Sequence, residues 1–258
     1  MLDIVPFLLF LFLASLRFLG VISSLIFFSD ASLPMMVRYY LSLAMAVASY
    51  PSLSSKALDV SILSSSFTFA FGALGELLVG IILGVLASSP LYALKIAGRL
   101  VSQQMGFAMA EVMDPMSEQR TSVIGQMKYL IGTWFWLYFG GHLLATQGIV
   151  ESLSIIPVGS PVFTLISLDG IRLWFKELFL LAMKVALPYF GILLLTEIGL
   201  GFIAKLIPQM NIFILGFPVK ILLGLVFLAI LSVAVIRYLM PLELDRFIEM
   251  LPLFWSHR

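Results

Sequence analysis

The sequence contains no cysteine, only two histidines and few charged residues. A chain without cysteine forms no disulfides and offers no thiolate to a substrate or a metal. The histidines, His142 and His257, are too far apart in the sequence to suggest a metal site. No nucleophile elbow, HExxH motif or phosphate-binding Gly-Lys loop is present. We therefore expect no metal and no cofactor, and we expect that the protein is not an enzyme.

Charge of either sign is scarce. The 258 residues include 15 Lys and Arg against 14 Asp and Glu, and no basic run exceeds two residues. This balance argues against nucleic acid as a partner. Hydrophobic residues make up 61% of the chain and charged residues 11%, whereas soluble domains have about 45–50% and about 25%. The composition therefore predicts an integral membrane protein.

Hydrophobic runs recur along the chain, and a membrane-spanning helix needs about 20 mostly apolar residues. The first run follows Asp3 and no basic residue, so we expect a retained span rather than a cleaved signal peptide. The sequence predicts an all-α, multi-helix membrane-associated protein with five spans and a marginal sixth: 4–28, 67–88, 123–146, 173–200, 212–238 and, marginally, 36–48.

The connections between these runs differ in character. Residues 50–66 and 147–170 are rich in Ser, Pro and Gly and are predicted loops, whereas residues 90–126 have helical periodicity at their centre. With six spans, the two sides of the membrane would carry equal numbers of Lys and Arg. A conventional membrane protein has an excess on the cytoplasmic side, so the tie indicates an unusual placement.

Several predicted spans are poorly suited to lipid. Each charged residue at a helix centre costs about 2.5–3.5 kcal/mol, and glycines at 72, 75, 80 and 84 allow close approach of helix backbones. For any one residue, a paired or snorkelling charge or a helix-packing glycine is the simplest interpretation. Together they favour helices that face protein or water, as in an assembly. The intramembrane charges are Arg17, Glu76, Lys184, Glu197 and Lys220.

The stretch VSQQMGFAMAEVMDPM, residues 101–116, combines a methionine stripe with polar residues. Met105, Met109 and Met113 are spaced four apart and would share one face of a helix. Gln103, Gln104 and two acids make the stretch a poor span. The stripe is either the buried face of a packing helix or an adaptable apolar seal, for which unbranched methionine is well suited.

A second distinctive stretch, IPQMNIFILGFPVKILLGL, occupies residues 207–225. Pro208 is expected to end one helix, and Gln209 and Asn211 to hydrogen-bond in a tight turn. Gly216 and Pro218 are expected to break the next helix near its start, with Lys220 one turn inside. This pattern indicates either a helical hairpin with an irregular apex or an ordinary loop between two spans.

The order PQMN, an aromatic residue and GFPVK resembles the C-terminal signature of the FliR family of flagellar biosynthetic proteins. The sequence QQMGFAMAEVMDP is similar to the central segment of that family, and the resemblance covers essentially the whole chain. Injectisome export proteins of the same superfamily share the PQ-x-N pattern, but the Gly-Phe-Pro at 216–218 looks more flagellar.

The resemblance implies a single export-gate domain over residues 1–258. A FliP-like part at about 1–170 would contain a plug at 101–116, and a FliQ-like helical hairpin would follow at about 171–258. The plug residues would be Met105, Gly106, Phe107, Met109 and Met113. The hairpin signature important for assembly would be Pro208, Gln209, Asn211, Gly216, Phe217, Pro218 and Lys220.

The resemblance also implies a function and a setting. The chain would be a non-enzymatic subunit of the flagellar type III export gate in the bacterial inner membrane, at the basal body, and would pass unfolded flagellar proteins outward. Its partners would be about five FliP-like subunits, FliQ-like subunits and an FlhB-like subunit. The alternatives are an injectisome export-apparatus subunit of the same superfamily, a secondary transporter, suggested by the intramembrane charges and broken helices, and a purely structural scaffold.

Overall fold

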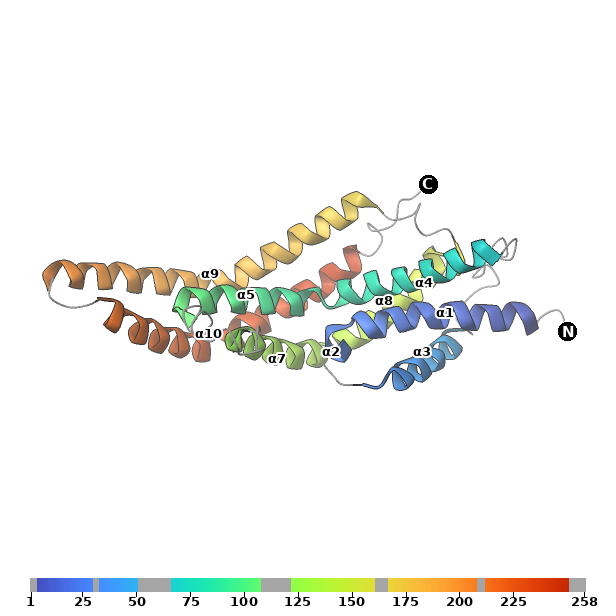
Figure 1. Cartoon of the computed structure of the whole chain (residues 1–258), viewed down its shortest axis with the longest axis horizontal. Helices are drawn as coiled ribbons and strands as arrows, with labels where there is room; N and C mark the ends of the chain where they lie inside the picture. The colour runs from blue at the N-terminus through green and yellow to red at the C-terminus, as the bar shows by residue number, and fades with distance from the viewer. Residues whose placement is uncertain are drawn as a thin grey trace. The chain divides into compact units, whose positions relative to one another are not determined.

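The computed structural model describes residues 4–29, 33–50, 66–107, 122–160, 167–207 and 212–250. These ranges are almost entirely helical and contain no β-strand, which confirms the predicted all-α class (Figure 1). The helices are α1 (Ile4–Ser24), α2 (Ile26–Ser29), α3 (Met35–Ser49), α4 (Ser66–Ala87), α5 (Ser89–Met105), α7 (Val123–Tyr138), α8 (Gly141–Ile155), α9 (Leu168–Leu206) and α10 (Ile212–Met250).

The chain forms two compact units, each built from separate stretches of sequence. Unit 1 comprises Met1–Ser89, Gly140–Phe175 and Leu244–Arg258, and unit 2 comprises Pro90–Phe139 and Lys176–Glu243. Most of the long helices α9 and α10 therefore belongs to unit 2, together with α5 and α7. The division of the chain into a FliP-like and a FliQ-like part stays a prediction.

Unit 1 is organised around the close packing of α1 against α4. A Cβ atom at Gly80 would lie 3.0 Å from the Cα of Gly20, so at this point the two backbones touch. Helix α3 packs on α1 and α8 packs on α4. The core beside the glycines contains large aliphatic and aromatic side chains, among them Leu13, Phe18, Val79 and Leu83. The helix-packing interpretation is confirmed for Gly80 and Gly84, which lie against the backbone of α1, and Gly72 and Gly75 are also buried in α4.

Unit 2 contains a second close approach between backbones, where α5 meets α7. A Cβ atom at Gly98 would lie 2.8 Å from the backbone nitrogen of Gly125. One turn away the side chain of Leu94 occupies the space left by Gly132. Helix α7 in turn contacts α9, because the amine of Lys128 lies over the ring of Tyr189. Small residues therefore bring α5 and α7 close together within this unit.

The predicted span at 123–146 is wrong, because this run forms two shorter helices rather than one. Helix α7 ends at Tyr138, and Gly140 adopts a left-handed conformation with φ of +77° before α8 begins. A glycine at positive φ ends a helix without steric cost, so the Gly140-Gly141 pair divides the hydrophobic run. The predicted loop at 147–170 is also partly wrong, since α8 continues to Ile155.

The expected helix break at Gly216 and Pro218 is wrong as well. Helix α10 runs through both residues and through Pro241, and α9 runs through Pro188. A proline removes one backbone hydrogen bond, but each of these helices continues over 39 residues. A break does occur earlier in the chain, at Leu25, where the predicted first span divides into α1 and α2.

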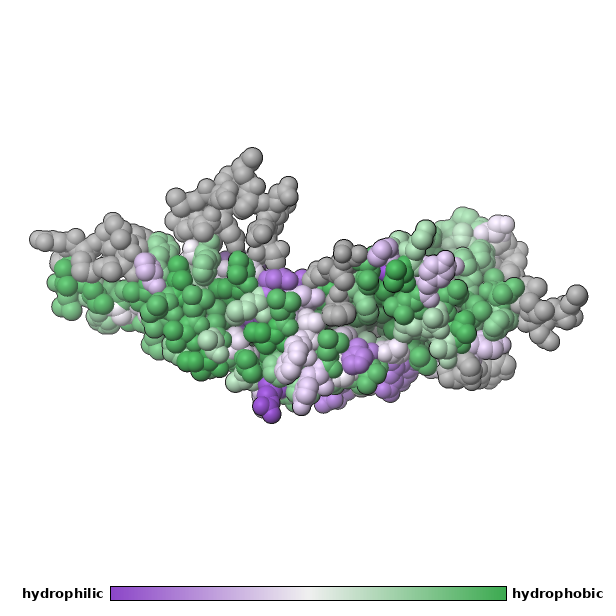
Figure 2. Space-filling model, turned by 90° about the horizontal axis from the view of Figure 1, so that it is seen from below, coloured by the Kyte–Doolittle hydropathy of each residue, from purple (hydrophilic) through white to green (hydrophobic). Residues whose placement is uncertain are grey.

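Four of the described helices are long and apolar enough to cross a membrane, which is fewer than the five or six expected. They contain Phe7–Ser24, Ser66–Ala87, Leu168–Leu206 and Gly216–Arg246, and α3 is a shorter apolar helix. Large apolar side chains on α9 and α10 point outward, and hydrophobic residues dominate the face in Figure 2. Examples are Leu194, Leu195 and Phe202 on α9, and Leu222 and Ile230 on α10. This surface is suited to contact with lipid or other apolar chains.

Candidate functional site

The two distinctive stretches of the sequence meet in unit 2, where the C-terminal end of α5 lies against α9 and α10. The carboxylate of Glu197 in α9 forms an ion pair with the ammonium group of Lys220 in α10. The amide nitrogen of Gln104 in α5 donates to the same oxygen, Oε1 of Glu197, over 3.5 Å. Glu197 therefore joins three helices, and one of its partners comes from each distinctive stretch.

Two steric contacts lie beside this polar cluster. The side chain of Met105 is fully buried and occupies the space left by Gly224 of α10, where a Cβ atom would lie 2.7 Å from its sulfur. Gly106 follows with a φ of +96°, a left-handed conformation that favours glycine. Its missing side chain leaves room for the ring of Phe217, whose Cδ1 would be 2.6 Å from a Cβ atom at Gly106.

The structure thus brings together some of the predicted plug and hairpin residues. Met105, Gly106, Phe217 and Lys220 take part in this junction, and Phe107, half-buried, comes next after Gly106. Gly216 is buried and Pro218 is exposed in the same part of α10. The predicted residues Met109, Met113, Pro208, Gln209 and Asn211 lie outside the described residues.

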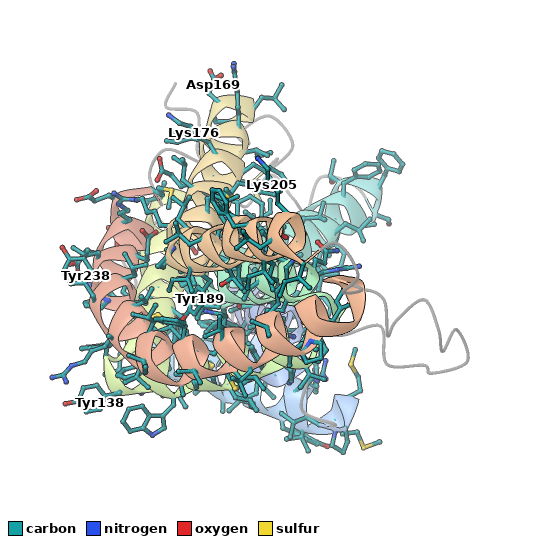
Figure 3. All side chains as sticks on the ribbon, turned by 90° about the vertical axis from the view of Figure 1, so that its left-hand side faces the viewer. Tyr138, Asp169, Lys176, Tyr189, Lys205 and Tyr238 are labelled. Carbon is teal, nitrogen blue, oxygen red and sulfur yellow. The ribbon has the colours of Figure 1, made fainter. Side chains whose placement is uncertain are left out.

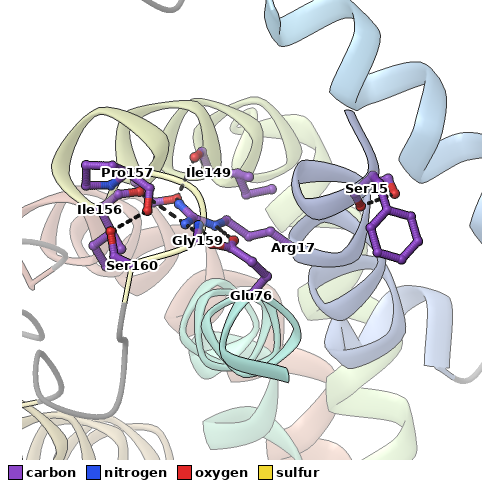
Figure 4. Close-up of polar contacts among 10 residues, drawn as sticks. Ser15, Arg17, Glu76, Ile149, Ile156, Pro157, Gly159 and Ser160 are labelled. Carbon is purple, nitrogen blue, oxygen red and sulfur yellow. Dashed lines mark hydrogen bonds and ion pairs between the residues drawn. The ribbon is translucent and has the colours of Figure 1, made fainter. Parts of the chain in front are cut away.

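The two charged residues of unit 1 that the sequence predicts within spans, Arg17 and Glu76, form a fully buried cluster (Figure 4). Nε of Arg17 donates to Glu76 over 2.6 Å, and a second guanidinium nitrogen donates to its other carboxylate oxygen over 3.1 Å. The guanidinium also donates to the hydroxyl of Ser152 and to the carbonyl of Ile156. The backbone N–H of Gly159 donates to Glu76 over 2.8 Å. Arg17 and Glu76 therefore tie α1, α4 and the chain that follows α8 together.

Lys184 has no comparable role in the structure. Its side chain is exposed on α9. The other four charges predicted to lie within spans form two pairs: Arg17 with Glu76, which is buried, and Lys220 with Glu197, which is partly exposed. The sequence identified these charges, but their partners depend on how the helices pack.

A buried lysine that the sequence did not single out lies on α7. Lys128 is inaccessible to solvent, and its Nζ has no hydrogen-bond partner among the described residues but lies 3.8 Å from the ring centroid of Tyr189. Figure 3 shows Tyr189 among the helices of unit 2, whereas Tyr138 and Tyr238 point outward. The phenol of Tyr189 shares a hydrogen bond of 3.1 Å with Ser232. Burial lowers the pKa of the Lys128 amine to about 7. The helix that carries it, α7, is not among the four described helices long enough to cross a membrane.

These arrangements hold helices together rather than present reactive groups. The carboxylates Glu76 and Glu197 are each engaged by basic side chains, and the described residues contain no group of three His, Cys, Asp or Glu side chains suited to a metal. The fold and the paired charges define a polytopic helical membrane protein. Its helices pack closely, and two ion pairs join residues of different helices.

Comparisons with known proteins identify the family. Residues 8–242 match the family described as bacterial export proteins, family 1, and the chain belongs to this family. It is 29% identical to the flagellar biosynthetic protein FliR of Escherichia coli, over 84% of this chain and 81% of that protein. It is 28% identical to FliR of Aquifex aeolicus over 96% and 94%. It is 31% identical to the Yop proteins translocation protein T of Yersinia pestis over 56% of each chain.

Proposed function

We propose that this chain is a non-enzymatic subunit of the flagellar type III protein export gate, and that residues 101–116 close its pore. Membership of the bacterial export family supports the export role. The flagellar system is favoured over the injectisome because the similarity to FliR extends over 81% and 94% of two relatives, against 56% of the Yersinia translocation protein.

The observation that carries the proposed closure is the junction at the end of α5. Met105 and Gly106 belong to the stretch expected to plug the pore, and they pack against Gly224 and Phe217 of the hairpin. The start of the proposed plug is therefore anchored on α10. An anchored segment rich in methionine is suited to a seal that has to yield to many unfolded chains, because the methionine side chain adapts to irregular partners.

The proposed setting is the bacterial inner membrane at the flagellar basal body, where the chain assembles with about five FliP-like subunits, FliQ-like subunits and an FlhB-like subunit. Four helices suited to a membrane and the apolar outer faces of α9 and α10 support this placement. Four of the five charges that suggested a secondary transporter form two local pairs, Arg17 with Glu76 and Lys220 with Glu197.

Deletion of residues 106–110 tests the proposed closure. The shortened chain is expected to enter the complex but to leave the membrane leaky to ions and small molecules, so that growth slows under ionic or osmotic stress. Deletion of the five residues 52–56, in a predicted loop, is the control of equal length and is expected to cause no leak. The measurements are complex yield on native gels and ion flux in vesicles. An assembled, tight complex after the deletion of residues 106–110 would mean that the gate lies elsewhere.

A further inference from the structure

A buried contact between a lysine and a tyrosine joins α7 to α9 inside unit 2. The amine of Lys128 lies 3.8 Å from the centroid of the Tyr189 ring, and the Tyr189 hydroxyl shares a hydrogen bond with Ser232 of α10. We propose that Lys128 is a proton-dependent switch of this packing: α7 is held against α9 while the amine is neutral and is released when the amine gains a proton. The inference concerns the packing of unit 2 and does not depend on the proposed closure of the pore.

Lys128 lies on the most closely packed face of α7. Gly125, Lys128 and Gly132 follow one another at intervals of three and four residues, so they share one side of the helix. A Cβ atom at Gly125 would lie 3.1 Å from the carbonyl oxygen of Lys95 in α5. The side chain of Leu94 occupies the space beside Gly132. Because the lysine side chain itself is inaccessible to solvent, its amine reaches water only if α7 moves.

The described residues around the amine provide no counter-charge. Its Nζ has no hydrogen-bond partner among them, and the ring of Tyr189 attracts a cation without accepting hydrogen bonds as water does. Of the described carboxylates in the unit, Glu197 pairs with Lys220. Glu177 and Glu243 have contacts of their own. The described basic residues on the surrounding helices are Lys95 and Arg99 on α5, Lys184 and Lys205 on α9, and Lys220 and Arg237 on α10.

These surroundings set the direction of the response to pH. Burial favours the neutral amine and lowers the pKa of Lys128 to about 7. When α7 separates and the amine enters water, its pKa returns to the ordinary, higher value of lysine. Between the two pKa values the separated form binds more protons, so the packed form gains stability as the pH rises above about 7. Acid therefore favours separation of α7 from α9.

Hydrogen exchange of backbone amides tests the switch in the whole chain, extracted together with the subunits that accompany it. Lys128→Met keeps an unbranched side chain but removes the amine. At each pH the wild type is compared with this variant, because the ratio of their exchange rates cancels the intrinsic pH dependence of exchange. For amides of α7, and of α9 around Tyr189, this ratio is expected to grow up to about thirtyfold from about pH 8.5 to about pH 6. A ratio that stays constant over this range would overturn the inference.

Two further variants separate protonation from packing. Lys184→Met removes an exposed lysine of α9 and is the matched control. It is expected to keep the pH response of the wild type, and loss of the response in this variant would overturn the assignment to Lys128. Lys128→Arg carries its charge throughout the range, so its α7 amides are expected to exchange fast at every pH. Amides of α1 and α4 in unit 1 are expected to exchange alike in all four proteins. If Lys128→Arg does not fold, the wild type and the two methionine variants still test the proposal.

Discussion

Glu76 and Glu197 each pair with a basic side chain, but in very different surroundings. Glu76 and Arg17 are fully buried and hydrogen-bonded to each other and to the chain around them, whereas the side chains of Glu197 and Lys220 are partly exposed on helices long and apolar enough to cross a membrane. Breaking a buried pair by removing one partner leaves an uncompensated charge in a medium that solvates it poorly. Loss of one partner of the first pair is therefore expected to destabilise unit 1.

Replacement of Glu76 by glutamine tests this difference at the level of a single residue. Glu76→Gln is expected to destabilise unit 1 by about 3–5 kcal/mol, because the guanidinium of Arg17 stays buried without a counter-charge. The measurement is the thermal unfolding midpoint of the purified complex together with its yield. Glu151→Gln, on the exposed surface of α8, is the control and is expected to behave as wild type.

A double variant separates charge from packing in the same cluster. Arg17→Met/Glu76→Met is expected to recover part of the lost stability, since two apolar side chains leave no buried charge behind. Recovery will be incomplete because the N–H of Gly159 and the carbonyl of Ile156 lose their partners. A double variant as unstable as Glu76→Gln would indicate that the hydrogen bonds, rather than the charge, dominate.

The sequence was informative about which residues are unusual but not about how they pair. Arg17, Glu76, Glu197 and Lys220 stand out as charges in apolar runs, yet pairing depends on which helix faces meet. Lys128 was missed because it lies near the start of the predicted span at 123–146, and its burial depends on tertiary packing. The packing of α7 against α9 places its amine over the ring of Tyr189.

At the scale of helices, the contact of α1 with α4 depends on the absence of side chains. A Cβ atom at Gly80 would lie 2.9 Å from the backbone carbonyl carbon of Arg17 and 3.0 Å from the Cα of Gly20. Backbone atoms cannot rotate away as a flexible side chain can, so any added atom moves the whole helix.

Substitution of this glycine by alanine tests the packing of the two helices. Gly80→Ala is expected to destabilise unit 1 by roughly 1–3 kcal/mol, the usual cost of overpacking. Gly191→Ala, in α9, is the matched control, since a Cβ atom there meets nothing within 4 Å. It is expected to be neutral or to stabilise by up to about 1 kcal/mol through the better helix propensity of alanine. Protease resistance of the two purified complexes measures the difference; equal resistance would argue against a tight contact between α1 and α4.

Helix positions were largely predictable, and helix ends were less so. The long apolar runs correspond to α1, α4, α9 and α10, because hydrophobicity over about 20 residues is a strong signal. Prolines misled the prediction at Pro218, where the helix continues. The sequence analysis placed Gly140 and Gly141 inside a span, because glycine within a membrane helix often serves helix packing. Whether such a glycine instead ends the helix depends on the tertiary structure around it.

At the scale of the whole chain, the outward faces of α9 and α10 carry many large apolar residues. A soluble monomer rarely exposes such a surface, and it has to be covered by lipid or by other subunits. The proposed assembly with FliP-like and FliQ-like subunits assigns part of it to protein contacts.

Purification tests this assignment. The chain extracted from cells in mild detergent is expected to co-purify with FliP-like and FliQ-like subunits in a complex much heavier than 28.6 kDa. Native mass spectrometry gives the mass and the composition. When produced without those subunits, the chain is expected to aggregate or to be degraded. A stable, monodisperse monomer would contradict the proposed assembly.

The sequence positions of the buried cluster in unit 1 determine when, during synthesis, Arg17 can meet its partners. Glu76 follows Arg17 by 59 residues, and Gly159 follows Glu76 by another 83. At a synthesis rate of about 5–20 residues per second, α1 waits roughly 3–12 s at the insertion machinery with an arginine that has no partner. The ribosome has to complete about 160 residues before the cluster closes. During this interval the guanidinium of Arg17 lacks the partners that it has in the folded protein.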